Sequence, residues 1–179
     1  MSEIKQIRDL IERLSRVASA EEWNEDINPS QWAALVYLSN ANKFSRSPSQ
    51  VAEYMSATRG TVSQTLKALA RKGLIKETPS ENDKRSISYS VSHKAAKIIQ
   101  NRKQMDETFA SLDKADLVKL ANGLEALTRS VLKQRGMREF GVCKNCTYHE
   151  KTENGGYCNL LNVKLNKSEI EQICHEYSG

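Results

Sequence analysis

The sequence lacks several features that would place it in other classes of protein. None of its first 142 residues is a cysteine, and no apolar run approaches the roughly 18 residues that a membrane-spanning helix needs. The N-terminus MSEIKQIRDLIERL mixes charges from the start, which is unlike a secretory signal. We therefore expect a cytoplasmic protein with no membrane partner, in which structural disulfides are rare.

Groups that carry catalysis are also scarce. The chain has three histidines, and it shows no Ser/His/Asp set, no phosphate-binding loop and no paired carboxylates. A thiol–disulfide oxidoreductase that uses Cys143 and Cys146 is the enzymatic alternative. Redox motifs of this kind lie at the start of a helix in a βαβ unit, and no such pattern surrounds these cysteines. We therefore expect that the protein is not an enzyme.

Positive charge is concentrated in one central segment. The formal net charge is +5, and residues 59–85 contain seven basic and three acidic side chains. The first 28 residues contain four basic and seven acidic side chains. This distribution favours a polyanionic partner for the central segment.

Two closely spaced helices are predicted in the same region. Asn28 and Ser47 are each followed by a proline and, three residues on, by a glutamine, which is the pattern of a capped helix start. Thr58 is the candidate cap of a helix over 58–72, and Gly73 is the expected stop residue. Helices over about 48–55 and 58–72 joined by a very short turn predict a helix-turn-helix.

A β-hairpin follows the second of these helices. LIKET is typical of a short strand, and SISYSV over residues 86–91 alternates apolar and polar residues. The segment PSENDKR between them is polar and turn-rich. The pattern predicts a wing with a charged tip.

Long helices are predicted on both sides of this unit. Ser92 caps one that includes Met105 and Phe109, and Asp113 begins the last one. Apolar residues recur at helical spacing near the N-terminus and again after Asp113; they are Ile4, Ile7, Leu10, Ile11, Leu14 and Val17, and Leu117, Leu120, Leu124, Leu127 and Val131. These two stripes exceed what one small domain can cover, so we expect a homodimer. Packing of the stripes on each other within one chain is the alternative.

Three segments together resemble the MarR family of winged-helix transcriptional regulators over roughly residues 5–135. NPSQWAALVYL is similar to the second helix of that family, SATRGTVSQTLKALARKGLI to its recognition helix, and ENDKRSISYSVS to its wing. The resemblance implies a mainly α fold with a small β-hairpin wing, a winged helix-turn-helix whose long flanking helices form a dimerisation region. It also implies that a dimer binds a pseudo-palindromic operator in double-stranded DNA.

The residues of the second helix favour the same DNA-reading surface. Arg59 can donate two hydrogen bonds to guanine, and Gln64 can pair with adenine. Gly60 and Ser63 are small and allow close approach to the major groove. A face that is merely solvated is the alternative.

Contacts with the phosphate backbone and the minor groove are expected at the ends of the motif. Thr58 and Thr61, near the positive end of the helix dipole, could hold a phosphate or only cap the helix. Lys84 and Arg85 on the wing could enter a minor groove. The predicted DNA-binding residues are Thr58, Arg59, Gly60, Thr61, Ser63, Gln64, Lys67, Lys84 and Arg85.

The last part of the chain has a composition of its own after RGMREFGV. We divide the chain into an N-terminal dimerisation helix (1–27), a winged helix-turn-helix (28–92), C-terminal dimerisation helices (93–136) and a four-cysteine extension (137–179). Within the extension, NKSEIEQIC is a short helix candidate.

The extension carries the pattern C-x2-C-x11-C-x15-C, formed by Cys143, Cys146, Cys158 and Cys174. Four thiolates are the ligand number of a structural zinc site and of a [4Fe–4S] cluster. Zinc sites are commonly built from two close pairs, whereas here only one pair is close, so we favour a [4Fe–4S] cluster over zinc. Free or redox-reactive thiols remain open. His149 and His175 could replace a cysteine as ligand, but we expect each to be a surface histidine.

A cluster in the extension would follow directly on the dimer-forming helix at 113–135. Our hypothesis is that the extension reports iron, oxygen or redox state by changing how the two chains are held. The alternative is a DNA-binding regulator in which zinc only stabilises the C-terminus.

Overall fold

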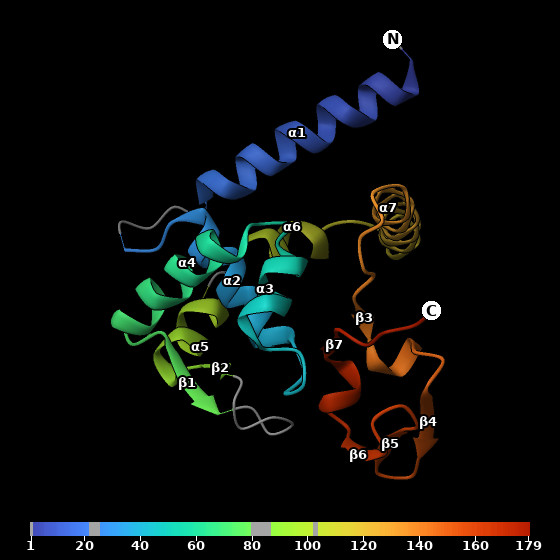
Figure 1. Cartoon of the computed structure of the whole chain (residues 1–179). Helices are drawn as coiled ribbons and strands as arrows, with labels where there is room; N and C mark the ends of the chain where they lie inside the picture. The colour runs from blue at the N-terminus through green and yellow to red at the C-terminus, as the bar shows by residue number, and fades with distance from the viewer. Residues whose placement is uncertain (1, 22–25, 80–86, 102–103) are drawn as a thin grey trace.

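The computed structural model describes residues 2–21, 26–79, 87–101 and 104–179. Figure 1 shows a helical body, with the long N-terminal helix above it, the long helix that precedes the C-terminal unit to its right, and a small β-rich unit at the C-terminus. The helices are α1 (Glu3–Glu21), α2 (Pro29–Asn40), α3 (Pro48–Tyr54), α4 (Arg59–Arg71), α5 (His93–Gln100), α6 (Gln104–Ala110) and α7 (Lys114–Gln134). The expected mainly α fold with a small β-hairpin is confirmed.

The helix starts predicted from local sequence are confirmed. The Asn28 side chain accepts a hydrogen bond from the Gln31 backbone, and the Gln31 side chain reaches back to the backbone of Asn28. Ser47 and Gln50 repeat this reciprocal cap at the start of α3. Each cap satisfies backbone N–H groups that a helix terminus leaves without partners.

One apolar core joins α2, α3, α4, α5 and the wing. α4 contributes Val62, Leu66 and Leu69, which are almost fully buried. The other members are Ile27, Trp32, Ala34, Leu35, Tyr37, Leu38, Ala41, Val51, Ala52, Leu74, Ile75, Tyr89 and Ala95. This core fixes α4 by its inner face and leaves its outer face to solvent.

The wing is an antiparallel pair of strands, β1 (Ile75–Pro79) and β2 (Ile87–Val91), with Ile75 opposite Val91. Tyr89 points into the core, as the alternation predicts. The predicted wing-tip residues Lys84 and Arg85 lie outside the described residues.

The helix expected to run from Ser92 through Met105 and Phe109 is instead two helices. Ser92 caps α5 as predicted, but α5 ends at Gln100 with Asn101 as its C-cap, and α6 begins at Gln104. Asparagine is a weak helix former and is favoured near helix ends, which explains the stop.

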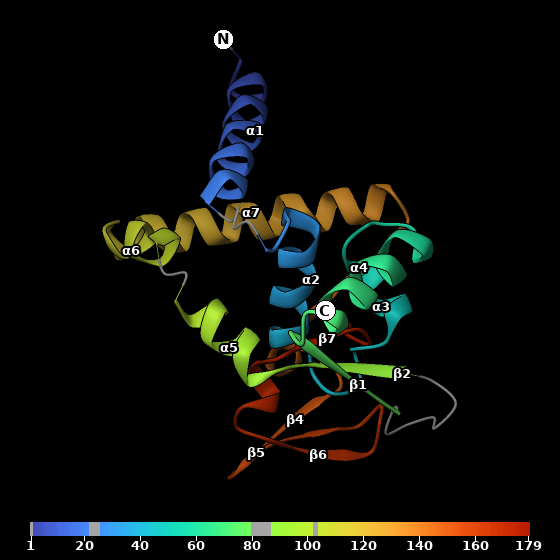
Figure 2. The ribbon, with the colours of Figure 1, turned by 90° about the vertical axis from the view of Figure 1, so that its left-hand side faces the viewer.

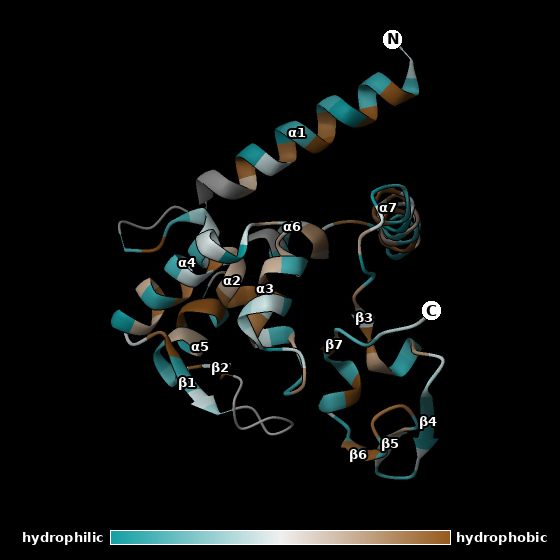
Figure 3. Cartoon of the chain, viewed as in Figure 1, coloured by the Kyte–Doolittle hydropathy of each residue, from teal (hydrophilic) through white to brown (hydrophobic). Residues whose placement is uncertain are grey.

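The apolar stripes of α1 and α7 are not covered within one chain. α1 projects away from the body, and α7 lies apart from it (Figures 1 and 2). Along α1 apolar and polar residues alternate in bands (Figure 3). Six apolar residues of α1 are exposed, as are Val118, Leu120, Leu124, Leu127 and Val131 of α7. In the described structure the two stripes therefore do not cover each other within one chain.

The C-terminal unit, residues 141–179, is termed the cysteine module. It contains β3 (Gly141–Val142), the 3-10 turn η1 (Cys143–Asn145), β4 (His149–Thr152), β5 (Gly155–Cys158), β6 (Val163–Asn166), the 3-10 turn η2 (Glu169–Glu171) and β7 (Ile173–Cys174). β4, β5 and β6 form one antiparallel sheet, and β3 pairs with β7.

The short helix predicted within NKSEIEQIC is present as η2, a 3-10 helix of three residues. Asn166 accepts hydrogen bonds from the backbone of Ser168 and Glu169, which closes a single turn. Only the three residues of η2 follow, because Ile173–Cys174 then pairs with Gly141–Val142. The strand pairing overrides the local helical pattern. In the part of the chain that the structure describes, no helix has the length and apolar character to cross a membrane.

Candidate nucleic-acid interface and four-cysteine site

The two helices of the predicted helix-turn-helix are joined by four residues. Ser56 adopts a positive φ of 53° in this turn, and the Ala57 N–H bonds to the carbonyl of Ala52. Thr58 then caps α4 by accepting a hydrogen bond from the Thr61 N–H over 3.2 Å. At the other end of α4, Gly73 has a φ of +67°, a conformation that glycine adopts without steric cost.

The predicted DNA-reading residues of α4 lie on its outer face. Arg59, Gly60, Gln64 and Lys67 are exposed, and Ser63 is half-buried. The hydroxyl oxygens of Thr58 and Thr61 lie 2.8 Å apart at the N-terminus of α4, so both side chains are part of the helix cap. α4 thus offers an exposed outer face that carries Arg59 and Lys67, opposite a fully buried apolar face.

All four cysteines line one small cavity in the cysteine module. Its volume is about 10 Å³, close to that of one water-sized sphere. Cys143 and Cys174 are buried, and Cys146 and Cys158 are half-buried. The backbone N–H of Cys146 bonds to the carbonyl of Cys143 over 3.1 Å, which folds the C-x2-C segment into a tight turn.

Hydrogen bonds to sulfur surround this cavity. The Asn42 side chain donates to the Cys143 sulfur over 3.4 Å, and the Ser178 N–H donates to the Cys146 sulfur over 3.5 Å. The pKa of Cys174 is lowered to about 6, first because the Cys143 thiol donates a hydrogen bond to its sulfur. Side-chain donors at Asn42 and Ser45 lower the pKa of Cys174 further, whereas burial opposes them. The Cys174 sulfur is therefore stabilised as a thiolate.

His149 and His175 have different surroundings. The His149 ring packs over Gly156, where a Cβ would lie 2.0 Å from the ring, and its buried Nδ1 has no hydrogen-bond partner among the residues that the structure describes. His149 also lines the four-cysteine cavity. The ring nitrogens of His175 instead lie 3.1 Å from a carboxylate oxygen of Glu53 and 3.2 Å from one of Glu176.

The cysteines surround a common cavity without forming a closed coordination shell. Among residues 2–21, 26–79, 87–101 and 104–179, no group of three or more His, Cys, Asp or Glu is placed so that it could hold a metal ion. The C-x2-C segment also differs from a redox motif, because Cys143 begins a three-residue 3-10 turn between two short strands and not an α-helix.

Comparisons with known proteins address the helical part of the chain. Residues 25–86 match the model of the MarR family. Residues 25–86 form a MarR-family domain. This segment runs from just before the cap of α2 through the helix-turn-helix and into the wing, so the resemblance noted from the sequence is confirmed. A search of curated protein sequences finds no match.

Solved structures with the same fold cover about three quarters of this chain, which is more than the segment matched by the family model. The MarR family regulator NMB1585 from Neisseria meningitidis has 26% sequence identity, covers 76% of this chain and 98% of its own, and has a TM-score of 0.58. Streptococcus pneumoniae FabT in complex with DNA has 20% identity, 74% and 99% coverage, and a TM-score of 0.59. A MarR transcriptional regulator from Methanosarcina mazei has 20% identity, 72% and 98% coverage, and the same TM-score. These structures are matched almost completely, while about a quarter of this chain has no counterpart in them.

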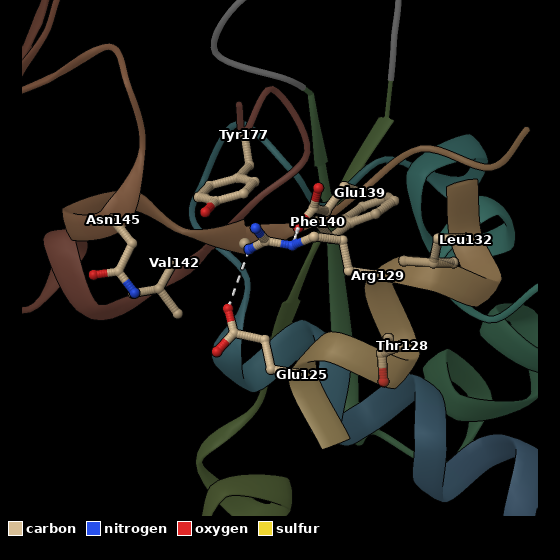
Figure 4. Close-up of a pocket in the computed structure, with 10 residues that line it drawn as sticks. Glu125, Thr128, Arg129, Leu132, Glu139, Phe140, Val142, Asn145 and Tyr177 are labelled. Carbon is tan, nitrogen blue, oxygen red and sulfur yellow. Dashed lines mark hydrogen bonds and ion pairs between the residues drawn. The ribbon is translucent and has the colours of Figure 1, made fainter. Parts of the chain in front are cut away.

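A larger cavity lies between α7 and the cysteine module. It has a volume of about 310 Å³, and Figure 4 shows Arg129 between the carboxylates of Glu125 and Glu139. The guanidinium lies 3.2 Å from Glu125 and 2.9 Å from Glu139, so its charge is compensated. The ring of Tyr177 faces the same space. Sequence reasoning did not identify this cavity, because residues 125–139 and Tyr177 meet only through tertiary contacts.

Sequence reasoning also missed the residues that connect the MarR-family domain to the cysteines. Asn42 and Ser45 lie between α2 and α3 and are 2% and 1% exposed. The sequence shows two polar residues in a short connection between helices. It does not show that they are buried, so it could not indicate their contact with the cysteine module.

Proposed function

We propose that the protein is a DNA-binding transcriptional regulator that reads the major groove with α4. The observation that carries the proposal is the arrangement of α4, whose exposed face bears Arg59, Gln64 and Lys67 while Val62 and Leu66 anchor the opposite face. A recognition helix contacts base edges with its N-terminal residues, and this is where Arg59 and Gln64 lie. FabT, which has the same fold, has been crystallised with DNA.

We also propose that the regulator acts as a homodimer. α1 and α7 expose apolar stripes that the described part of the chain leaves uncovered, and each stripe runs along nearly the whole helix. A second copy of the chain can cover both stripes at once, because a two-fold axis brings identical surfaces together. A dimer would present two α4 helices to a pseudo-palindromic site.

Selection from random DNA duplexes tests the DNA-binding proposal. Full-length protein is incubated with the duplex pool, the bound fraction is sequenced, and the recovered duplex is titrated at two salt concentrations. We expect an enriched two-fold symmetric sequence and an affinity that falls as salt rises. Recovery of no enriched sequence, with salt-independent binding, would reject the proposal.

The four cysteines are the second part of the proposed function. We propose that they hold a [4Fe–4S] cluster. Four sulfurs line one cavity, two of them are buried, and the donors at Asn42 and Ser178 are of the kind that tune iron–sulfur centres. Because the cysteines do not yet form a closed shell, binding would draw the half-buried Cys146 and Cys158 inward. Such a cluster can change its oxidation state, and it can assemble or break down as the supply of iron and oxygen changes.

Zinc is the second candidate for the same four sulfurs. The cavity of about 10 Å³ is nearer in size to a single ion than to a four-iron cluster, and this favours zinc. Analysis of iron, sulfide and zinc after oxygen-free purification separates the candidates. About four irons and an absorption band near ~400 nm support the cluster. One zinc per chain without colour supports the single ion, and a metal-free protein rejects both.

A further inference from the structure

The connection between α2 and α3, residues 41–47, lies directly against the cysteine module. The Asn42 N–H donates to the carbonyl of Ile173 over 2.8 Å, and Ala41 forms a parallel bridge with Ile173. The Asn42 side chain donates to the Cys143 sulfur and accepts from the Phe44 N–H over 3.1 Å. The second bond fixes the orientation of the amide, because the oxygen must face Phe44 and the nitrogen must face the sulfur.

A second buried residue of the connection, Ser45, contacts the cysteine module next to Cys174. The His175 N–H, directly after Cys174 in the chain, donates to the Ser45 hydroxyl over 2.8 Å. The Phe44 ring also packs against the small core that contains Cys143, Cys174 and Leu165. Both buried cysteines are therefore held through residues of the MarR-family domain.

The other end of the connection contacts the wing and caps the first helix of the helix-turn-helix. The Arg46 guanidinium donates to the carbonyl of Ala41 over 2.6 and 2.8 Å, while the Arg46 carbonyl accepts from the Tyr89 N–H of β2 over 3.1 Å. Ser47, the next residue, caps α3. A displacement of residues 41–47 would therefore reach the wing and the first helix of the helix-turn-helix.

A second link joins the module to the C-terminal end of α3. Glu53 lies 3.1 Å from His175 and 3.6 Å from Arg138. Phe140, just before β3, packs edge-on against Tyr54 with ring centroids 5.3 Å apart. This end of α3 leads into the four-residue turn before α4.

We infer that occupancy of the four-cysteine site sets the geometry of the α2–α3 connection, and through it the DNA affinity of the same chain. The inference rests on the proposed function, and it places the transmission within one protomer, through Asn42, Ser45 and Glu53. Ligation of all four sulfurs fixes Cys143 and Cys174. Asn42 hydrogen-bonds Cys143, and Phe44 packs against the small core that contains both cysteines. Coupling of this kind is reciprocal, so DNA binding must change metal affinity by the same factor.

The test compares full-length protein as purified without oxygen, the same protein stripped with a chelator, and stripped protein restored with ferrous iron plus sulfide or with zinc. Amide hydrogen exchange is read at Asn42 and Tyr89, and affinity is read on the selected duplex. We expect loading to slow exchange at both amides and to change DNA affinity at least about fivefold. Tyr89 is informative because it lies on the wing and not in the module.

Two variants separate transmission from loss of metal. Asn42→Ala, compared with the unchanged protein at matched metal content, should reduce the difference in DNA affinity between loaded and stripped protein. Because Asn42 is buried, Glu53→Gln tests the second link at an exposed position, with Glu171→Gln as the matched control. Glu171 pairs with Lys144 inside the module. Glu53→Gln should shrink the difference, and Glu171→Gln should leave it unchanged.

The outcomes distinguish this inference from the proposed function. If loaded and stripped protein bind the selected duplex equally and their Tyr89 amides exchange alike, the coupling is wrong and DNA binding stands. If neither form binds any duplex, the proposed function is wrong. Failure of the protein to take up iron, sulfide or zinc would overturn the coupling and the four-cysteine proposal together.

Discussion

Asn42 and Cys143 are 101 residues apart in the sequence, yet the Asn42 amide donates a hydrogen bond to the Cys143 sulfur over 3.4 Å. Both residues are buried, Asn42 against the MarR-family domain and Cys143 in the cysteine module. This contact places the cysteines against the helix-turn-helix of their own chain. The sequence-based hypothesis placed their influence on the dimer-forming helix at 113–135, whereas the route that we infer runs through residues 41–47 of the same chain.

Replacement of Arg59 by alanine should weaken operator binding by about 1–3 kcal/mol and relax the preference at one base pair, because a bidentate contact with guanine is lost. Arg71→Ala, on the last turn of the same helix, is the matched control and should have a smaller, sequence-independent effect. Titration of the selected duplex and of single-base variants measures both. Equal and uniform losses in the two variants would mean that the N-terminal half of α4 does not read bases.

Arg85→Ala should weaken binding to all duplexes evenly and lower the salt slope by about one, because a phosphate or minor-groove contact is removed. Affinities at four or more salt concentrations give the slope. Arg16→Ala serves as control, because Arg16 pairs with Glu12 on α1, far from the wing. An unchanged slope in Arg85→Ala would remove the wing tip from the DNA interface.

Leu124→Arg should convert a dimer to a monomer, because the charge would have to be buried in the apolar α7 stripe. Leu124 is 48% exposed in one chain, so the protomer itself should tolerate the change. Sedimentation at micromolar concentration reports the mass. Asn122→Arg, on the opposite face of α7, is the control and should remain a dimer. A single-chain mass for the unchanged protein would reject the dimer outright.

Cys143→Ser should abolish binding of iron or zinc, because one of four thiolate ligands is lost. His149→Gln is the matched control beside the same cavity and should retain the full metal content. Metal content per chain and the thermal unfolding midpoint are measured together, since a ligand that binds only the folded state raises the midpoint. Equal metal loss in both variants would show that His149 is itself a ligand.

Leu66→Ala should lower the free energy of unfolding by about 2–5 kcal/mol, because Leu66 is 1% exposed and its loss leaves a cavity beneath α4. Lys67→Ala, the exposed neighbour, should change the free energy of unfolding by less than about 0.5 kcal/mol. Urea unfolding followed by circular dichroism measures both. A small effect at Leu66 would mean that α4 is not anchored by its inner face.

Much of the DNA-binding part could be predicted because its signals are local. The caps at Asn28, Ser47 and Thr58 and the stop at Gly73 use residues within one helical turn. The alternation of Ile87, Tyr89 and Val91 with serines likewise predicts which face of the strand is turned toward the core. The predicted helices and the wing followed from these features.

The cysteine module was harder to predict because its strands are short and pair across the chain. β3 and β7 are two residues each and lie about thirty residues apart, which leaves no repeating pattern to recognise. The helix expected in NKSEIEQIC is for this reason limited to the three residues of η2. The grouping of the cysteines around one cavity was expected from their number, whereas the sulfur donors at Asn42 and Ser178 were not.

The sequence by itself determined the helix-turn-helix, the wing, the apolar stripes and the four cysteines, because capping, periodicity and residue type act over a few neighbouring positions. Only the tertiary structure decided that residues 41–47 lie between the cysteines and β2. That contact depends on burying Asn42, Ser45 and Phe44 between two units that are distant in sequence. The free energy of this burial is gained only when both units are folded and in contact, so no single segment of the sequence indicates it.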